Sequence, residues 1–287
     1  MNKTIKIYAV IFAIVLAILA LLEINRNEVV DWRKNYDTAK KTPFGLYVFD
    51  KEANSIFGNH LIKINESPYD YYNEKTEKKP HNILIIEQNI DGESWNKIFS
   101  HISKGSDAMV VSEYFSPKLI DTLGIWASNI SYEDNQIFKL TDKKFSKDTL
   151  IVDKLPSRRG FSEISANTEI LGVATDKETK QQPNFIKVKY GKGNVYLHAD
   201  PLFLTNYYLL KKGNKTYFQD VFSYLPNRET LWFTEETSAS APSSSILRVV
   251  LANPPLKYAW WLFLAGLLLF TFFNAKRKQR IVPIVEP

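Results

Sequence analysis

The chain has 287 residues, 45% of them apolar, with 37 Lys and Arg against 31 Asp and Glu. These proportions are those of a folded globular protein and exclude wholesale disorder. The absence of cysteine excludes disulfides, thiolate metal sites and cysteine nucleophiles. A net charge of +6 would suit an anionic partner such as a nucleic acid, provided that the charge lies on the folded domain.

Two uncharged apolar runs, residues 7–22 and 258–275, are predicted to be transmembrane helices. A hydrocarbon core of ~30 Å needs roughly 20 helical residues, with ~17 as the usual minimum. Buried core helices are the alternative, although neither run shows a polar stripe. The first run could also be a cleaved signal peptide, but the sequence LLEINRNEVV that follows has no small-x-small cleavage site.

Basic residues next to the two runs predict the orientation of the chain. The positive-inside rule places both termini in the cytoplasm and residues 25–257 on the other side of the membrane. Without these flanks the remaining region is almost neutral, so the expected partner is the lipid bilayer and not a nucleic acid. The residues that determine this topology are Lys3, Lys6, Lys276, Arg277, Lys278 and Arg280.

The predicted organisation has six parts, and the central one is a soluble domain. A transmembrane anchor, a polar stalk, the domain, a linker with a juxtamembrane helix, a second transmembrane helix and a basic cytoplasmic tail follow one another. Their bounds are 1–24, 25–41, 42–237, 238–257, 258–275 and 276–287.

Within the domain, the first half of the sequence alternates between strands and helices. Thr42-Pro43 is typical of a helix start, and the segment 66–82 is expected to be a loop. Two continuous apolar runs, 82–88 and 107–115, alternate with helices at 94–103 and 118–124, the second capped by Ser116-Pro117, which indicates βαβ units and a parallel sheet.

In the second half, residues 125–190 alternate apolar and polar positions, as antiparallel strands do. Gly191–Asn194 then predicts a hairpin turn, followed by helices at 205–211 and 217–225 and a last strand at 229–235. The predicted fold class is α/β, a parallel sheet with antiparallel additions, flanked by two transmembrane helices.

Several segments resemble an uncharacterised bacterial family of the Bacteroidota, domain of unknown function 4350. They are TPFGLYVFD, DAMVVSEYF, GKGNVYLHADPLFLTN and the ending NPPLKYAWWLFLAGLLLF with AKRKQRIVP. The resemblance implies a flavodoxin-like fold similar to class I glutamine amidotransferases, a bacterial inner-membrane location and a periplasmic domain. It also implies other membrane proteins as partners, in a system with a MoxR-type ATPase, and a longer cytoplasmic tail than IVPIVEP.

Amidotransferase chemistry requires a cysteine thiolate, which this chain lacks. Ser112 and Glu113 follow a predicted parallel strand, where open sheets place ligands, but no G-x-S-x-G surrounds Ser112. His198, Asp200 and Asn206 follow another strand. His198 and Asp200 could contact a ligand or metal; alternatively, an Asp-Pro turn caps the next helix and His198 is hydrogen-bonded in place.

The remaining polar clusters carry weaker signals. His60, His81, His101 and His198 have no metal-site spacing, and no cofactor is expected. Arg158-Arg159-Gly160 could bind a carboxylate or phosphate, or form a solvated loop. Tyr69, Tyr71 and Tyr72 could stack on sugars, contact a partner or anchor their own loop.

Two functional hypotheses follow. The first is a non-catalytic, membrane-anchored, extracytoplasmic binding or assembly protein. The second is an extracytoplasmic hydrolase acting on envelope glycan or peptide through Ser112, Glu113, His198 or Asp200. An enzyme should bring at least two of these side chains within hydrogen-bond reach in one pocket.

Overall fold

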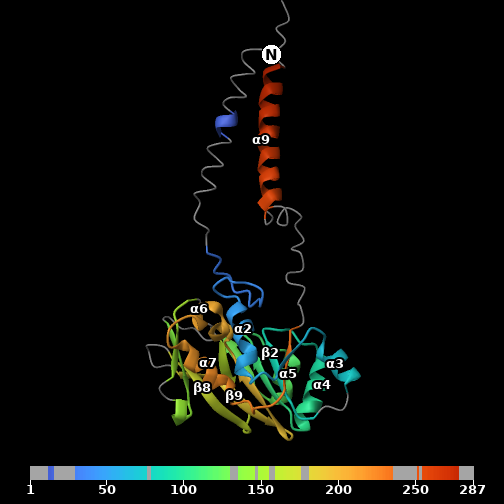
Figure 1. Cartoon of the computed structure of the whole chain (residues 1–287), viewed down its shortest axis with the longest axis vertical. Coiled ribbons are helices and arrows are strands. Elements are labelled where there is room, and N and C mark those ends of the chain that lie inside the picture. Colours follow the sequence, from blue (N-terminus) through green and yellow to red (C-terminus); the bar gives the residue numbers. More distant parts are fainter. Residues whose placement is uncertain are drawn as a thin grey trace, which may run out of the picture. The chain divides into compact units, whose positions relative to one another are not determined.

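The computed structural model describes residues 12–15, 30–75, 79–129, 135–145, 148–154, 159–175, 181–234, 251 and 254–277. The chain divides into two compact units, residues 1–235 and 236–287 (Figure 1). The first unit contains a large sheet with its covering helices. The second contains the long helix α9 (Pro254–Arg277).

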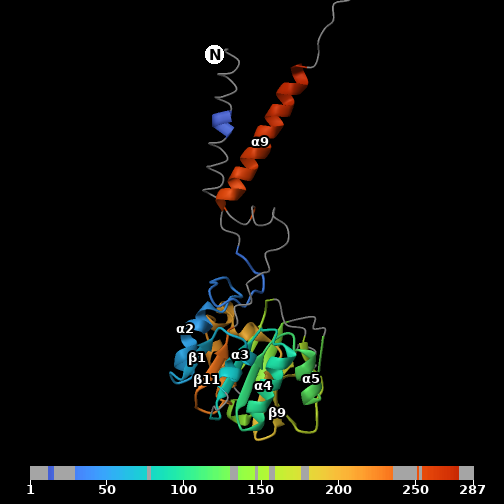
Figure 2. The same cartoon turned by 90° about the vertical axis from the view of Figure 1, so that its right-hand side faces the viewer.

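Within the described residues, nine strands of the first unit form one mixed sheet. The first five strands across the sheet are parallel, and from the fifth onward each neighbouring pair is antiparallel. Figure 2 shows β1 and β11 side by side at the parallel end. The order is β1 (Leu61–Ile64), β11 (Thr230–Phe233), β2 (Asn82–Ile86), β3 (Asp107–Val111), β10 (Gly193–His198), β9 (Gln181–Tyr190), β8 (Thr168–Thr175), β5 (Gln136–Leu140) and β6 (Thr149–Val152).

A second, two-stranded sheet pairs β4 (Trp126–Asn129) with β7 (Arg159–Glu163) in antiparallel fashion. The architecture is therefore mixed α/β, with a parallel half and an antiparallel half in one large sheet. The turn between β9 and β10 is a two-residue connection in which Gly191 has a left-handed φ of 58°. A Cβ at Gly191 would lie 2.6 Å from the Cα of Ser103, so a larger residue would also clash.

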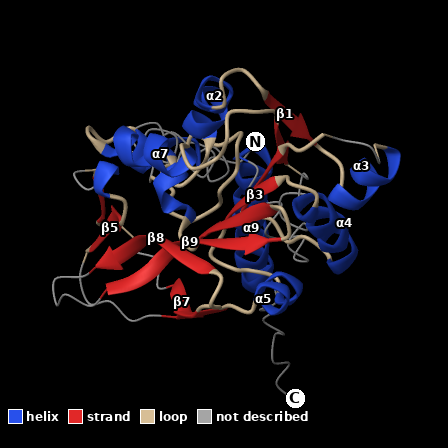
Figure 3. Ribbon diagram, turned by 90° about the horizontal axis from the view of Figure 1, so that it is seen from below, coloured by secondary structure: helices blue, strands red, loops and turns tan. Residues whose placement is uncertain are grey.

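Helices cover the sheet on both faces, and each layer has its own hydrophobic core (Figure 3). Leu84 and Ile86 of β2 belong to one core, whereas Ile83 and Ile85 belong to the other, which explains the continuous apolar run. One layer contains α2 (Tyr47–Ile56), the 3₁₀ helix η2 (Pro201–Leu204), α6 (Asn206–Leu209) and α7 (Asn214–Phe222); the other contains α3 (Pro68–Glu74), α4 (Gly92–Ser103) and α5 (Pro117–Leu123). A short 3₁₀ helix, η1 (Lys143–Phe145), lies between β5 and β6.

Two helix starts differ from the sequence prediction. The segment expected to be a loop contains α3, whose N-cap Ser67 accepts a hydrogen bond from the Asp70 amide. The helix expected at Thr42-Pro43 begins only at Tyr47, because a turn closed by the Gly45 amide on the Thr42 carbonyl precedes it. A Cβ at Gly45 would lie 2.2 Å from the Lys40 carbonyl oxygen, so this turn requires glycine.

The predicted fold class needs one correction, which concerns the flanking transmembrane helices. No helix within the described part of the chain is long and apolar enough to span a bilayer, so this prediction is wrong for those residues.

The other predictions for the chain ends lie largely outside the described residues. This applies to the apolar run at 7–22, apart from residues 12–15, and to the linker and juxtamembrane helix up to residue 250. It applies equally to Lys3, Lys6, Lys278 and Arg280. Lys276 and Arg277 belong to the last turn of α9.

Candidate functional site

The carboxyl ends of β2, β3 and β10 meet at one edge of the parallel half, which we call the carboxyl edge. The Ser112 amide donates to the His198 carbonyl over 3.0 Å, and the Glu87 amide donates to the Val111 carbonyl over 2.9 Å. Residues that follow these three strands therefore lie close together. In open α/β sheets this edge is the usual place for a ligand.

Ser112 is buried, and its hydroxyl is used locally. The Oγ donates to the Tyr114 carbonyl (2.8 Å) and accepts from the Tyr114 amide (3.1 Å). Although the backbones of Ser112 and His198 are adjacent, no hydrogen bond joins their side chains in the described structure. Ser112 thus forms a turn, and its side chain also interacts with the Glu87 carboxyl and lowers the pKa of that group.

His198 is completely buried among aromatic rings, including Phe203 at 4.4 Å between ring centroids. Its Nδ1 accepts from the Asp200 amide (3.2 Å), so the neutral ring carries its proton on Nε2, 3.1 Å from the Tyr217 hydroxyl. Burial lowers the pKa of His198 to about 3. A neutral ring enclosed on this side of the sheet is poorly placed to accept a proton from Ser112.

Asp200 and Asn206 both bind backbone groups. The Oδ1 of Asp200 accepts from the Leu202 amide (2.8 Å) and caps η2. The Oδ1 of Asn206 accepts from the Val48 amide, while its Nδ2 donates to the carbonyls of Lys40 (2.9 Å) and Thr42 (2.7 Å). Asn206 therefore fastens the chain that enters α2.

Glu113 is covered by the chain's own N-terminal segment, residues 30–46. Its Oε1 accepts from the Lys34 ammonium at 2.5 Å and from the Tyr36 hydroxyl at 2.8 Å. Trp32 adds edge contacts to Phe44 (5.7 Å) and Tyr207 (5.4 Å between ring centroids). Residues that the sequence predicts to be a stalk thus pack on the carboxyl edge.

The carboxyl edge carries an excess of acidic groups. The pKa of Glu87 is raised to about 7, with burial as the largest cause and the Glu113 charge acting in the same direction; the Glu113 amide, Lys34 and the Ser112 side chain lower it. Burial and the charges of Asp200, Glu113 and Glu87 raise the pKa of the Tyr36 hydroxyl far above its usual value. Three carboxyl groups therefore influence this one hydroxyl.

Sequence reasoning missed Glu87, Lys34 and Tyr36. Glu87 was expected inside a strand, but its left-handed φ of 48° turns the chain away from β2, and its Oε1 accepts from the Glu113 amide at 2.5 Å. A carboxylate directly after a buried parallel strand is a recognisable signal. Lys34 and Tyr36 carry no such signal, because they reach Glu113 from 79 and 77 residues away.

The other candidates lie elsewhere. The guanidinium of Arg159 stacks on Tyr114 at 4.2 Å, whereas Arg158 is outside the described residues. Tyr71 and Tyr72 are buried, and Tyr69 is 40% exposed. Within the described ranges, no group of three or more His, Asp or Glu side chains could hold a metal ion.

A family profile, Domain of unknown function (DUF4350), matches residues 38–221. The chain belongs to this family. The match covers the carboxyl edge and most of the mixed sheet. No curated protein matches the chain.

Solved structures give only distant likenesses to this DUF4350 chain. A putative ThuA-like protein from Bacteroides uniformis ATCC 8492 is 10% identical with a TM-score of 0.42, over 62% of this chain and 84% of that one. The cytoplasmic protein STM1381 from Salmonella typhimurium LT2 is 10% identical with a TM-score of 0.34, over 61% and 75%.

A β-galactosidase from Bacillus circulans sp. alkalophilus is 12% identical with a TM-score of 0.30, over 44% of this chain and 21% of that one. This chain spans about a fifth to a quarter of the length of the glycosidase structures that it matches. With all three TM-scores below 0.5, the likenesses carry no argument about activity. The amidotransferase-like fold implied by the family resemblance stays a prediction from the sequence.

Proposed function

We propose that this DUF4350 chain is a non-catalytic binding or assembly domain. The observation that carries the proposal is the occupancy of the carboxyl edge by the chain's own Lys34 and Tyr36. Both bind the same oxygen of Glu113, in the place where an open α/β sheet would hold a substrate.

The competing hydrolase hypothesis finds less support in the same geometry. It needs a nucleophile within hydrogen-bond reach of a base. Ser112 uses its hydroxyl within a turn, and the buried His198 ring binds the Tyr217 hydroxyl and the Asp200 amide, with no hydrogen bond to the Ser112 hydroxyl among the described residues. A pocket of about 500 Å³ lies between α2 and α7 and includes none of Ser112, Glu113, His198 and Asp200.

A partner protein is the expected counterpart of such a domain. The resemblance stated above points to membrane proteins of a MoxR-type ATPase system as partners. Large side chains that remain exposed on the folded unit, such as Tyr114 (66%) and Trp126 (54%), are available for contact. The Ser112 hydroxyl binds the backbone of Tyr114, so the exposed Tyr114 ring is not used in that turn.

The test combines an activity measurement with a binding measurement on the full-length chain. Wild type and Ser112→Ala are incubated with a fluorophosphonate probe and with isolated envelope glycan and peptide. A photo-crosslinking residue at position 114 or 126 then captures neighbours in cells. We expect no labelling and no release of product, together with the same discrete crosslinked protein for both chains. Product release that Ser112→Ala abolishes would establish the hydrolase instead.

A further inference from the structure

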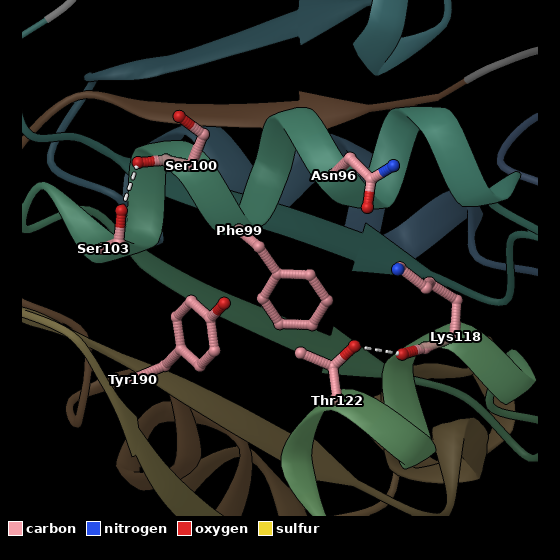
Figure 4. Close-up of a pocket in the computed structure, with 7 residues that line it drawn as sticks. All are labelled: Asn96, Phe99, Ser100, Ser103, Lys118, Thr122 and Tyr190. Carbon is pink, nitrogen blue, oxygen red and sulfur yellow. Dashed lines mark hydrogen bonds between the residues drawn. The ribbon is translucent and has the colours of Figure 1, made fainter.

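A separate pocket of about 280 Å³ opens between α4, α5 and the end of β9 (Figure 4). Phe99 lies at its centre, with Tyr190 on one side and Lys118 and Thr122 on the other. Asn96 and Ser100 of α4 complete the rim. None of the residues of the carboxyl edge lines this pocket, so it is a distinct candidate site.

The floor of the pocket is aromatic. The rings of Phe99 and Tyr190 lie 4.8 Å apart between centroids and are tilted by 45°. Phe99 is only 5% exposed, so Tyr190, which is half-buried, supplies the accessible ring. An aromatic ring of this kind can pack against the apolar C–H face of a ligand.

The rim offers both donors and acceptors of hydrogen bonds. Ser103 donates its hydroxyl proton to the Ser100 carbonyl (2.8 Å), and Thr122 donates to the Lys118 carbonyl (2.7 Å). Each hydroxyl therefore keeps its oxygen lone pairs for a ligand donor. The Asn96 amide supplies one group of each kind, with only a long contact of 3.4 Å to Glu93.

Lys118 gives the pocket a positive charge. Its side chain is exposed, and it forms no ion pair with another described residue. Among the described residues, the acidic side chain in contact with the rim is that of Glu93, which accepts from the Asn96 amide. The ammonium can thus pair with an anionic group of a ligand that also contacts Tyr190.

We propose that this pocket binds a small carbohydrate that carries a carboxylate, such as a uronic acid. The aromatic ring contacts the apolar face of the sugar, the mixed rim matches its hydroxyls, and Lys118 binds the carboxylate. The volume lies just below the ~300–1,000 Å³ of ordinary ligand pockets, which suits a single sugar ring. The inference rests on the proposed binding function and names the ligand class for it.

The experiment uses ligand-observed saturation-transfer NMR with the full-length chain. The probes are glucuronate, glucose as the neutral sugar, and acetate as the carboxylate without a ring. Each is titrated against wild type, Lys118→Gln and Tyr190→Leu. The matched control is Lys97→Gln, because the Lys97 ammonium lies over Tyr69 at 5.3 Å and not in the pocket.

We expect glucuronate to bind more tightly than glucose or acetate. Lys118→Gln should weaken glucuronate binding about tenfold, as expected for loss of one charged hydrogen bond, without changing glucose binding. Tyr190→Leu should weaken both sugars, and Lys97→Gln neither. Circular dichroism verifies that each variant is folded.

Three results would overturn the inference: no glucuronate signal, equal affinity for acetate and glucuronate, or glucuronate binding that Lys118→Gln leaves unchanged. None of these results would contradict the proposed function, which fails only if the chain releases product through Ser112. The two proposals can therefore fail separately.

Discussion

The two edges of the parallel half hold charged groups in different ways. At the amino edge, Arg228 binds the Asp107 carboxylate (2.6 Å), the Asn82 amide oxygen (2.8 Å) and the Gly105 carbonyl (3.1 Å). One positive and one negative charge are thus balanced. At the carboxyl edge, Glu87 and Glu113 share a single nearby ammonium, that of Lys34.

The amino edge is a hydrogen-bonded network between strands, whereas the carboxyl edge is a surface that the segment 30–46 covers. The amino edge joins β2, β3 and the residues before β11, and Asp107 also accepts from the Asn194 amide at 2.7 Å. The carboxyl edge depends on the segment 30–46, which precedes α2 in the sequence and binds Glu113 through Lys34 and Tyr36. Loss of a partner should therefore cost more at the amino edge, whereas pH should matter more at the carboxyl edge.

The largest effect is expected from Arg228→Met. The substitution leaves Asp107, whose side chain is only 9% exposed, without its cation. Loss of one partner from a buried ion pair costs about 3 kcal/mol of the free energy of unfolding. Urea unfolding of the full chain at pH 7 measures it. A loss below about 1 kcal/mol would show that the amino edge is not held by this ion pair.

Glu87→Gln should stabilise the folded chain at high pH, because it removes the cost of burying a charged carboxylate at the carboxyl edge. Because the pKa of Glu87 is about 7 when folded against 4.5 normally, the folded state binds the proton more tightly. The free energy of unfolding then decreases as pH rises from 4.5 to 7, by about 3 kcal/mol in total. The variant should gain about that amount at pH 8 and nothing at pH 4.5, measured by urea unfolding at both. Equal gains at the two values would contradict the prediction.

His198 should make the chain less stable as the pH falls, opposite to the pH dependence caused by Glu87. Its folded pKa of about 3 lies below the ordinary 6.5, so the unfolded state binds more protons between these values. Stability is complete above pH 6.5 and falls by about 3 kcal/mol at pH 4. The loss is best measured in the Glu87→Gln background, where the opposing contribution is absent. Adding His198→Phe should flatten the profile; an unchanged acid loss would assign it to other groups.

Lys34→Met should destabilise the chain by about 1–2 kcal/mol, because Glu113 loses a charged hydrogen bond in a partly buried place. The matched control is Lys187→Met, whose partner Glu169 is 62% exposed and whose loss should cost about 0.5 kcal/mol or less. A double-mutant cycle with Glu113→Gln isolates the Lys34–Glu113 coupling. Equal losses for both lysines would mean that the N-terminal segment is not fastened by this pair.

Much of the fold follows from local patterns in the sequence. The apolar runs that became β2 and β3 bury both faces, and Ser116 caps α5 as its position before Pro117 predicts. The prediction missed α3, since adjacent tyrosines in a charged segment look like a loop although Tyr71 and Tyr72 are buried. Such burial depends on tertiary contacts.

The candidate site was predictable only in part. Strand ends placed Ser112 and His198 at one edge, because parallel neighbours end together. The roles of the Ser112 and His198 side chains could not be predicted from the sequence, because each depends on a hydrogen-bond partner that the fold supplies, such as Tyr217 for His198. The membrane spans were predicted from apolar runs alone, and the described part of α9 is not sufficient for one.

The position of β11 has a consequence for synthesis of the chain. This strand, residues 230–233, lies between β1 and β2 and is the neighbour through which β1 joins the sheet. A growing chain that has not reached residue 233 therefore exposes an unpaired edge on β2 and a β1 without its partner. Completion of the sheet must wait until the ribosome has released nearly all of the first unit, so premature termination before β11 yields an aggregation-prone fragment instead of a smaller folded domain.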